Sequence, residues 1–375
     1  MPKWIFLFLA LFTLAACGRN RDGAPQATGP EAFFSANLQR TGVFTGKGVS
    51  SPALPRWQFQ TGEWVFTAPA VAEGAVYFGS YDGNFYAADI STGEEKWRYT
   101  LGEPIVASPA VSGNLVFFGG LDGNLYALDR QTGAEVWRFA TRGSITASPA
   151  LAYGFAYVGS EDGKLYAINV NTGQEVWHVE TGSPILFEAA IAGDLLLVGN
   201  GAGVLTAVQA INGTPAWTFE NPGSSFSAGP VVGEGVVYLT LSNDQLLGEL
   251  VALNLANQQP RWRVTLPSEA YASPALWDNT LYVAILAGKL LALEASTGQQ
   301  RWEFATSETV FSSPAIAEGL VYFGSWDENL YAVDGRSGQQ RWLFTTGGGV
   351  SSPAVHDGVV YVGSDNGVLF AIPQE

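Results

Sequence analysis

Eight tryptophans recur along this chain of 375 residues at almost constant intervals. Successive intervals are 40 residues, except for one of 45 residues between the fifth and the sixth tryptophan. The eight are Trp57, Trp97, Trp137, Trp177, Trp217, Trp262, Trp302 and Trp342. A period of this length is typical of solenoids, propellers and other arrays, in which one supersecondary unit is copied and stacked. The spacing therefore predicts eight copies of one structural unit.

Each unit is predicted to be one blade of a β-propeller. The clearest copy, Ser108 to Phe139, contains four short runs of β-branched, aromatic and aliphatic residues. Glycine-bearing turns such as Asp122-Gly123 separate these runs. Asp-Gly between apolar runs favours a tight hairpin, because both central residues of a type I′ turn need positive φ. Four short strands without helical periodicity between them are typical of one antiparallel blade.

The two ends of the chain predict how the ring closes. The last unit ends near Ile372 without a tryptophan-bearing fourth strand, whereas a strand around Trp57 precedes the first complete unit. Pairing this N-terminal strand into the last blade removes two unpaired sheet edges, which otherwise promote aggregation. We therefore predict an all-β fold, an eight-bladed β-propeller of four-stranded antiparallel blades closed by N-terminal strand pairing. The propeller is expected to occupy residues 49–375 and to be monomeric.

The repeated tryptophans are predicted to be structural. Each indole ring can lie across the neighbouring blade and bury about 150–250 Å². Room for the ring is expected at a small residue that recurs in the third strand, namely Ala87, Ala127, Ala167, Ala207, Ala252, Ala292, Ala332 and Ala371. The repeated Asp-Gly pairs are likewise interpreted as turn chemistry, and no metal site is predicted.

Composition narrows the classes of function. The formal net charge of −16 argues against nucleic acid as a partner, because binding through phosphates requires a basic surface. Cys17 is the only cysteine, so thiols can form neither a disulfide nor a zinc cluster within the chain.

The N-terminus carries a targeting motif. A short apolar run ends in Leu14-Ala15-Ala16-Cys17, which resembles the lipobox of bacterial lipoproteins. Residues 1–16 are therefore predicted to be a signal peptide, with Cys17 as the lipid anchor and residues 17–48 as a tether and N-terminal extension. The expected location is the cell envelope. This is the outer membrane, facing the periplasm, if the organism has two membranes, and otherwise the outer leaflet of the cell membrane.

The repeated units resemble the pyrroloquinoline quinone (PQQ) type of β-propeller repeat. The pattern Ser-Pro-Ala-Val, Tyr-Ala-Leu-Asp, Thr-Gly and Trp recurs over about residues 52–372. This resemblance implies two classes of function. One class contains quinone-dependent alcohol and sugar dehydrogenases. The other contains non-catalytic lipoproteins that scaffold the machinery for inserting β-barrels into the outer membrane.

The dehydrogenase class fits the sequence less well. The resemblance implies PQQ held between a tryptophan and a vicinal disulfide, with calcium bound by carboxylate and amide side chains and an aspartate as base. This chain has no cysteine pair, and its one candidate acid is Glu188, where Phe187-Glu188-Ala189 replaces Ser-Pro-Ala. We therefore expect no catalytic residue and no cofactor. The hypothesis is a lipid-anchored, non-enzymatic scaffold that binds a protein, with a β-barrel assembly component as the candidate partner. The alternative is a redox propeller that binds PQQ with calcium, or another small molecule.

Departures from the repeat predict the binding face. The turn between the second and third strands should emerge on the same face as the link between blades. Aromatic and apolar residues occur there where the repeat requires none, and we predict them to bind the partner: Trp64, Tyr81, Leu121 and Trp326. The channel mouth is expected to contain Phe66, Phe187, Glu188, Tyr271 and Phe311. The fifth unit carries a four-residue insertion within residues 241–248.

Overall fold

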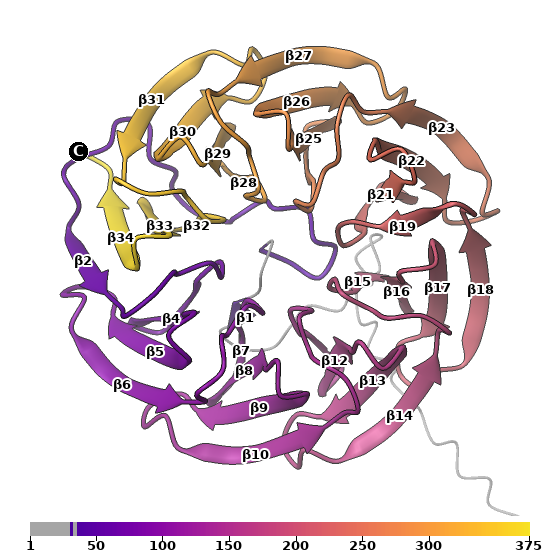
Figure 1. Ribbon diagram of the computed structural model, residues 1–375, viewed down its shortest axis with the longest axis horizontal. Coiled ribbons are helices and arrows are strands. Elements are labelled where there is room, and N and C mark those ends of the chain that lie inside the picture. The colour runs from indigo at the N-terminus through magenta and orange to yellow at the C-terminus, as the bar shows by residue number, and fades with distance from the viewer. Residues whose placement is uncertain (1–30, 33–35) are drawn as a thin grey trace, which may run out of the picture.

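Eight antiparallel β-sheets form a ring around a central channel in the computed structural model (Figure 1), which describes residues 31–32 and 36–375. This architecture confirms the predicted eight-bladed propeller. The predicted signal peptide and Cys17 lie outside the described residues. Within the described part, no helix is long and apolar enough to cross a membrane.

The first four blades are regular. The first contains β3 (Ala70–Ala72), β4 (Ala75–Gly79), β5 (Asn84–Asp89) and β6 (Glu95–Thr100). The second contains β7 (Ala110–Ser112), β8 (Leu115–Gly119), β9 (Asn124–Asp129) and β10 (Glu135–Ala140), with β1 (Glu31–Ala32) paired to β7. The third contains β11 (Ala150–Ala152), β12 (Phe155–Gly159), β13 (Lys164–Asn169) and β14 (Glu175–Glu180). The fourth contains β15 (Ala190–Ala192), β16 (Leu195–Gly199), β17 (Val204–Gln209) and β18 (Pro215–Glu220).

The remaining blades follow the same order. The fifth contains β19 (Ser224–Phe226), β20 (Val231–Gly233), β21 (Val236–Asn243), β22 (Gly248–Asn254) and β23 (Pro260–Thr265). The sixth contains β24 (Ala275–Trp277), β25 (Thr280–Ile285), β26 (Lys289–Glu294) and β27 (Gln300–Ala305). The seventh contains β28 (Ala315–Ala317), β29 (Leu320–Gly324), β30 (Asn329–Asp334) and β31 (Gln340–Thr345). The eighth contains β32 (Ala354–His356), β33 (Val359–Gly363), β34 (Val368–Pro373) and the N-terminal strand β2 (Trp57–Gln60).

The eighth blade closes the ring as predicted. Strand β2 pairs antiparallel with β34, with Trp57 opposite Ala371. Phe59 of β2 packs edge-on against Phe78 of the first blade, with ring centroids 5.3 Å apart. The strand therefore completes one sheet and also contacts the neighbouring blade.

The repeated tryptophans join each blade to the next one. Each lies opposite the predicted small residue of the third strand, as in the pair Trp137 and Ala127. The Trp137 ring covers Gly173 in the third blade so closely that an added Cβ would lie 2.7 Å from it. Its Nε1 donates to the Val170 carbonyl at 2.9 Å. These contacts pack each ring between two neighbouring blades.

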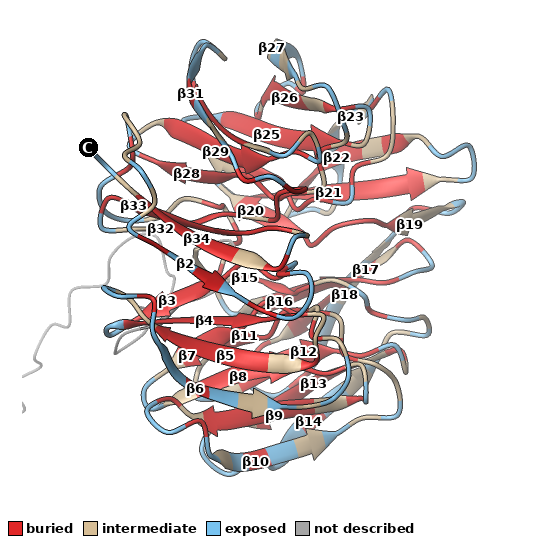
Figure 2. Cartoon of the chain, turned by 60° about the vertical axis from the view of Figure 1, so that its left-hand side comes forward, coloured by how far each residue is buried: buried red, intermediate tan, exposed pale blue. Residues whose placement is uncertain are grey.

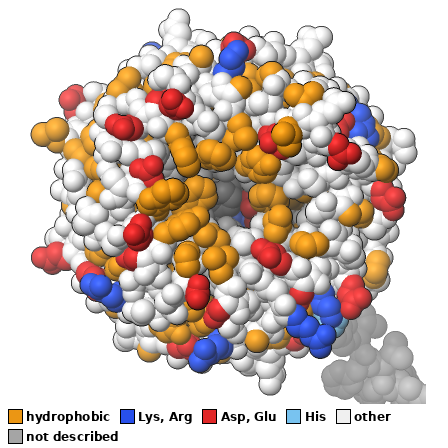
Figure 3. Space-filling model, in the orientation of Figure 1, with side chains coloured by type: hydrophobic (Ala, Val, Ile, Leu, Met, Phe, Trp, Pro, Cys, Tyr) orange, Lys and Arg blue, Asp and Glu red, His pale blue; other side chains and the backbone are white. Residues whose placement is uncertain are grey.

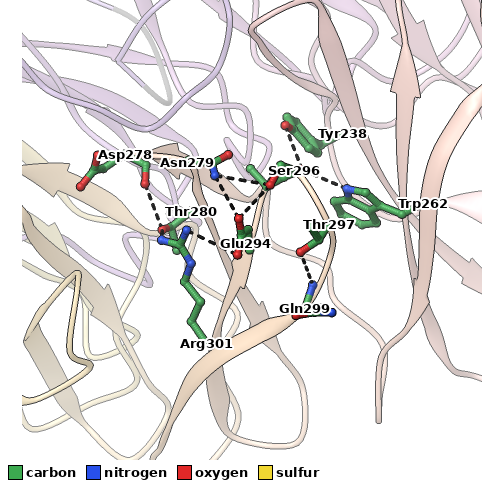
Figure 4. Close-up of polar contacts among 11 residues, drawn as sticks. Tyr238, Trp262, Asp278, Asn279, Thr280, Glu294, Ser296, Thr297, Gln299 and Arg301 are labelled. Carbon is green, nitrogen blue, oxygen red and sulfur yellow. Dashed lines mark hydrogen bonds and ion pairs between the residues drawn. The ribbon is translucent and has the colours of Figure 1, made fainter.

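Figure 4 shows the same contact between the fifth and sixth blades. Trp262 Nε1 donates at 2.9 Å and the Tyr238 hydroxyl at 3.3 Å to one carbonyl, that of Ala295, in the turn after β26. Figure 2 shows that buried residues fill the inner strands of the blades, whereas the outermost strands alternate. The blades are thus held by side chains packed between neighbouring sheets.

The insertion in the fifth blade lengthens its middle strands. Strand β21 has eight residues and pairs with β22 as far as the turn at Asp244–Leu247. Its extra length also pairs with β19, which forms in the preceding link between blades. The insertion therefore changes the wall of the propeller at one blade only.

The segment from residue 37 to residue 48 crosses several blades. Backbone carbonyls of Leu38, Gln39 and Thr41 accept hydrogen bonds from β15 of the fourth blade, β20 of the fifth and β24 of the sixth. Gly42 and Phe44 bond Ile316 of the seventh blade. These pairings hold in place a segment for which the sequence predicted only an N-terminal extension.

Candidate binding site at the channel mouth

The links between blades and the second-to-third-strand turns lie on one face. Backbone hydrogen bonds join the two kinds of segment. The Tyr81 N–H donates to the Trp64 carbonyl at 2.9 Å, and the Trp326 N–H donates to the Thr309 carbonyl at 2.9 Å. We call this the mouth face, because the channel opens on it (Figure 3).

Three of the four predicted partner-binding residues belong to one aromatic cluster, which consists of Trp64, Phe66, Tyr81, Phe311 and Trp326. Ring centroids of Trp64 lie 5.7 Å from Tyr81 and 6.3 Å from Trp326. Phe311 lies 5.1 Å from Trp326, and Phe66 lies 6.2 Å from Tyr81. The cluster therefore connects the seventh and first blades across the eighth.

The exposure of the cluster is uneven. Trp64 and Trp326 expose 39% and 40% of their surface, whereas Tyr81 is half-buried. Burial raises the pKa of the Tyr81 hydroxyl. Leu121 occupies the same turn position in the second blade and is half-buried, but it lines neither of the two cavities described below.

All five residues predicted at the channel mouth line one cavity. Phe66, Phe187, Glu188, Tyr271 and Phe311 surround a volume of about 440 Å³. Val106, from the link between the first and second blades, and Leu186, next to Phe187, add apolar surface. Figure 3 shows hydrophobic side chains gathered around this central opening. The mouth is thus a mainly apolar concavity next to the aromatic cluster, and the two share Phe66 and Phe311.

A ring of serine hydroxyls encircles the channel below this rim. In most blades the serine that begins Ser-Pro-Ala accepts a hydrogen bond from the backbone N–H of the preceding blade. Ser108 N–H donates to Ser148 Oγ at 3.1 Å, and Ser273 N–H donates to Ser313 Oγ at 3.0 Å. The Ser-Pro-Ala motif is therefore a structural contact between innermost strands.

Ala68 replaces this serine in the first blade, and Glu188 and Gly229 replace it in the fourth and fifth blades. The motif of the fourth blade is therefore Glu188-Ala189-Ala190, one residue later than the predicted Phe187-Glu188-Ala189. Glu188 reaches past the fifth blade, and its Oε1 accepts a hydrogen bond from Ser273 Oγ of the sixth blade at 2.6 Å. A Cβ on Gly229 would lie 2.5 Å from that same oxygen. The two departures from the repeat are therefore coupled: the missing side chain of Gly229 provides the space for Glu188.

Arg40 places a positive charge near Glu188. Its Nε donates to the Ala189 carbonyl at 3.2 Å, and one terminal nitrogen donates to the Pro149 carbonyl at 3.3 Å. Burial lowers the pKa of the guanidinium, and the Glu188 carboxylate acts in the opposite direction. Glu188 itself is only 5% exposed. This carboxylate is therefore hydrogen-bonded by a hydroxyl and lies in the field of a buried cation, which suits a structural role.

The residues at the mouth do not fit PQQ with calcium. Calcium requires about six to eight oxygen ligands converging on one point, whereas Glu188 is the one carboxylate that lines the mouth cavity. In the part of the chain that the structure describes, no group of three or more His, Cys, Asp or Glu residues could hold a metal ion. The vicinal disulfide of the dehydrogenases has no counterpart, because the sequence contains one cysteine.

A second, smaller cavity lies within the aromatic cluster and includes a residue that was not among the predicted site residues. Trp64, Phe311, Trp326 and Asp365 line a volume of about 40 Å³, which we call the Asp365 pocket. Asp365 Oδ1 accepts a hydrogen bond from the Gly349 N–H at 2.9 Å. When the eighth unit is aligned with the first, Asp365 takes the repeat position of Tyr81. This alignment could have identified Asp365 from the sequence.

Comparisons with known proteins agree with this architecture. The family model described as "Outer membrane protein assembly factor BamB" matches residues 51–107, 100–218, 201–342 and 247–375. No curated protein matches the sequence.

Among solved structures, BamB from Moraxella catarrhalis is similar with a TM-score of 0.71 and 18% identity, covering 85% of this chain and 98% of that chain. Quinohemoprotein alcohol dehydrogenase from Comamonas testosteroni has a TM-score of 0.79 and 14% identity, covering 94% and 81%. The computationally designed Ika8 protein has a TM-score of 0.76 and 18% identity, covering 86% and 100%. At these identities the structures show a shared fold alone. The family model, in contrast, matches the sequence itself along most of its length, and the chain therefore belongs to the BamB family of outer membrane protein assembly factors.

Proposed function

We propose that this protein is a lipid-anchored, non-enzymatic scaffold of the cell envelope that binds a component of the β-barrel assembly machinery. Cys17 carries the lipid in this proposal, and the mouth face carries the partner. Membership of the BamB family supports the class of partner, since the family description names outer membrane protein assembly. Lipid anchoring rests on the lipobox ending at Cys17.

The observation that carries the proposal is the aromatic cluster. Its rings are partly exposed and in mutual contact, at link and turn positions where the repeat requires no aromatic residue. Exposed apolar patches on soluble proteins mark interaction sites, and tryptophan and tyrosine are enriched among the residues that dominate binding energy. The adjoining mouth cavity of about 440 Å³ offers a recess for a side chain or short segment of the partner.

The absence of enzymatic activity is supported by the chemistry of the channel. A catalytic carboxylate must reach the reacting group, directly or through one water. Glu188 is instead nearly buried and hydrogen-bonded to Ser273 across the channel wall. A test is to add PQQ and calcium to the purified protein. Neither a stable chromophore after desalting nor dye-linked alcohol oxidation is expected, and either one would support the redox alternative.

The partner is tested by replacing Trp64, Tyr81 and Trp326 together with serine. Hot-spot residues contribute about 2 kcal/mol or more each, so the β-barrel assembly component should no longer co-purify from envelope extracts. The control replaces Val136, Val176 and Leu343 with serine, since these apolar residues on outermost strands are more exposed than the residues of the cluster. Loss of the partner in the control alone, or in neither variant, would contradict the proposed face.

The anchor is tested separately with Cys17→Ala. This variant should lose labelling by radioactive palmitate and leave the membrane fraction. Continued labelling with unchanged fractionation would contradict the lipoprotein assignment, whatever the partner experiment shows.

A further inference from the structure

The Asp365 pocket combines aromatic walls with a negative charge. The rings of Trp64 and Trp326 stand at 84° to each other and form two walls of a corner. Asp365 also lines this corner. Its volume of about 40 Å³ exceeds the roughly 10–15 Å³ that one water needs, so the end of a side chain can enter.

The repeat explains why the carboxylate of Asp365 is available. In the first and seventh blades the aspartate of the turn, Asp82 or Asp327, is bonded to the tyrosine four residues later. In the eighth blade Asn366 takes that turn position and Phe370 replaces the tyrosine. Asp365 stands one residue earlier, where Tyr81 and Trp326 stand in their own blades. Within the described residues its side chain receives one hydrogen bond, from the Gly349 N–H to Oδ1, so that Oδ2 receives none.

The charge of the surrounding surface favours a cation. Within the links and turns of the mouth face Arg142 is the one basic residue, whereas the acidic residues include Glu63, Glu269 and Glu308. Figure 3 shows most lysines and arginines of this face near its outer edge. An acidic surface attracts cationic groups and raises their local concentration.

We infer that the Asp365 pocket binds a lysine side chain of the partner protein. The inference rests on the proposed function, since it specifies the group that the partner presents to the aromatic cluster. Aromatic ring faces attract cations, most strongly those of tryptophan. A single unbonded carboxylate oxygen suits the compact charge of an ammonium group, whereas a guanidinium prefers two oxygens in a bidentate pair.

The test uses Nα-acetyl-lysine methylamide as a probe of the full chain. The probe is titrated while the indole N–H signals of Trp64 and Trp326 are followed by NMR, assigned with Trp64→Phe and Trp326→Phe. The neutral control is the same molecule acetylated on Nζ. Saturable shifts are expected with the charged probe, with binding about three- to thirtyfold tighter than for the neutral one. Equal shifts with both probes would overturn the inference.

Two charge variants distinguish binding by Asp365 from attraction by the overall negative charge of the mouth face. Asp365→Asn should weaken binding of the lysine probe about fivefold or more. Glu161→Gln is the matched control, because Glu161 occupies the same repeat position in the third blade and is exposed. It should bind like the unchanged protein. Equal weakening in the two variants, or tighter binding of the corresponding arginine probe, would overturn the assignment of a lysine site.

The experiments can contradict the lysine site and the proposed function independently of each other. If the lysine probe does not bind but the serine variant still loses its partner, the proposed face stands and the lysine site falls. If the probe binds but no β-barrel assembly component co-purifies, the lysine site stands and the proposed partner falls.

Discussion

At the scale of single residues, the repeated tryptophans should dominate stability. Trp137→Ala removes a ring that is packed on Gly173 and a hydrogen bond to the Val170 carbonyl. We expect it to lower the free energy of unfolding by about 3–5 kcal/mol. Urea unfolding followed by circular dichroism measures the change. Val136→Ala, at a neighbouring residue that is 51% exposed, should cost well under 1 kcal/mol, and similar losses for both would contradict the interlocking role.

The sequence predicted residues that repeat better than residues that do not. The alanine opposite each tryptophan could be predicted because eight copies share it. Arg40 could not, because it lies in a segment that occurs once, and its contact with Ala189 spans 149 residues. Asp365 was overlooked for a different reason. It resembles the turn aspartates of the other units, and only a strict alignment shows that it stands one position earlier.

At the scale of elements, the innermost strands of neighbouring blades are coupled through Glu188 and Gly229. Gly229→Ser places a Cβ within 2.5 Å of Glu188 Oε1 and displaces this side chain from Ser273. The same change in a Glu188→Ser background meets no carboxylate and restores the serine of the other blades. We expect Gly229→Ser to lower the free energy of unfolding more in the unchanged protein than in the Glu188→Ser background.

A double-mutant cycle measures this coupling. Urea unfolding of the two single variants and of the double variant should give an interaction energy of about 0.5–3 kcal/mol, the range for residues in direct contact. An additive result would mean that Glu188 does not need the space at Gly229. The sequence indicated that Glu188 departs from the repeat. Its hydrogen-bond partner Ser273 could not be predicted, because the spacing of the repeats does not show how far a side chain extends across a neighbouring blade.

The hairpin turns give the blades an acid-sensitive element. Burial raises the pKa of Asp82, Asp162 and Asp327, but hydrogen bonds from a tyrosine hydroxyl and backbone N–H groups outweigh it, so each pKa is lowered. A hydrogen bond from Arg341 lowers the pKa of Asp334 to about 2. A lowered pKa in the folded state stabilises the protein above the unfolded pKa, near 4. This contribution is lost as the pH falls from about 4 towards 2.

Urea midpoints measured from pH 7 to pH 2.5 should therefore stay level above about pH 5 and fall steeply below pH 4. Replacing Asp82, Asp162 and Asp327 with asparagine should lower the urea midpoint at pH 7. It should also make the fall of the midpoint below pH 4 less steep, because asparagine does not titrate. If the midpoint of the triple variant falls as steeply below pH 4 as that of the unchanged protein, other carboxylates cause the acid sensitivity.

At the scale of the whole molecule, the ring depends on one strand that is distant in sequence from its sheet. Strand β2 pairs with β34 across about 310 residues of chain and also packs Phe59 on the first blade. This closure could be predicted because the last unit lacks its fourth strand and an additional strand precedes the first complete unit. The crossing of the inner strands by residues 37–48 could not, since backbone pairing imposes no side-chain pattern on so short a segment.

Replacing Trp57–Gln60 with Gly-Pro-Gly-Pro tests closure while keeping the segment at residues 37–48. Proline cannot donate to the sheet, so the edge of β34 is left open and the Phe59 contact is lost. We expect a markedly lower thermal midpoint and concentration-dependent light scattering, because open edges pair with other chains. As a control, replacing the exposed turn Asp244–Leu246 with Gly-Ser-Gly should leave the thermal midpoint and the light scattering unchanged.

A synthetic peptide of residues 55–61 should bind the open edge of β34 as an added strand. It should raise the thermal midpoint of the variant with increasing peptide concentration, as expected for a ligand of the folded state. If the peptide has no effect on a destabilised variant, the damage lies elsewhere than in the missing strand, and closure by β2 is not what holds the ring together.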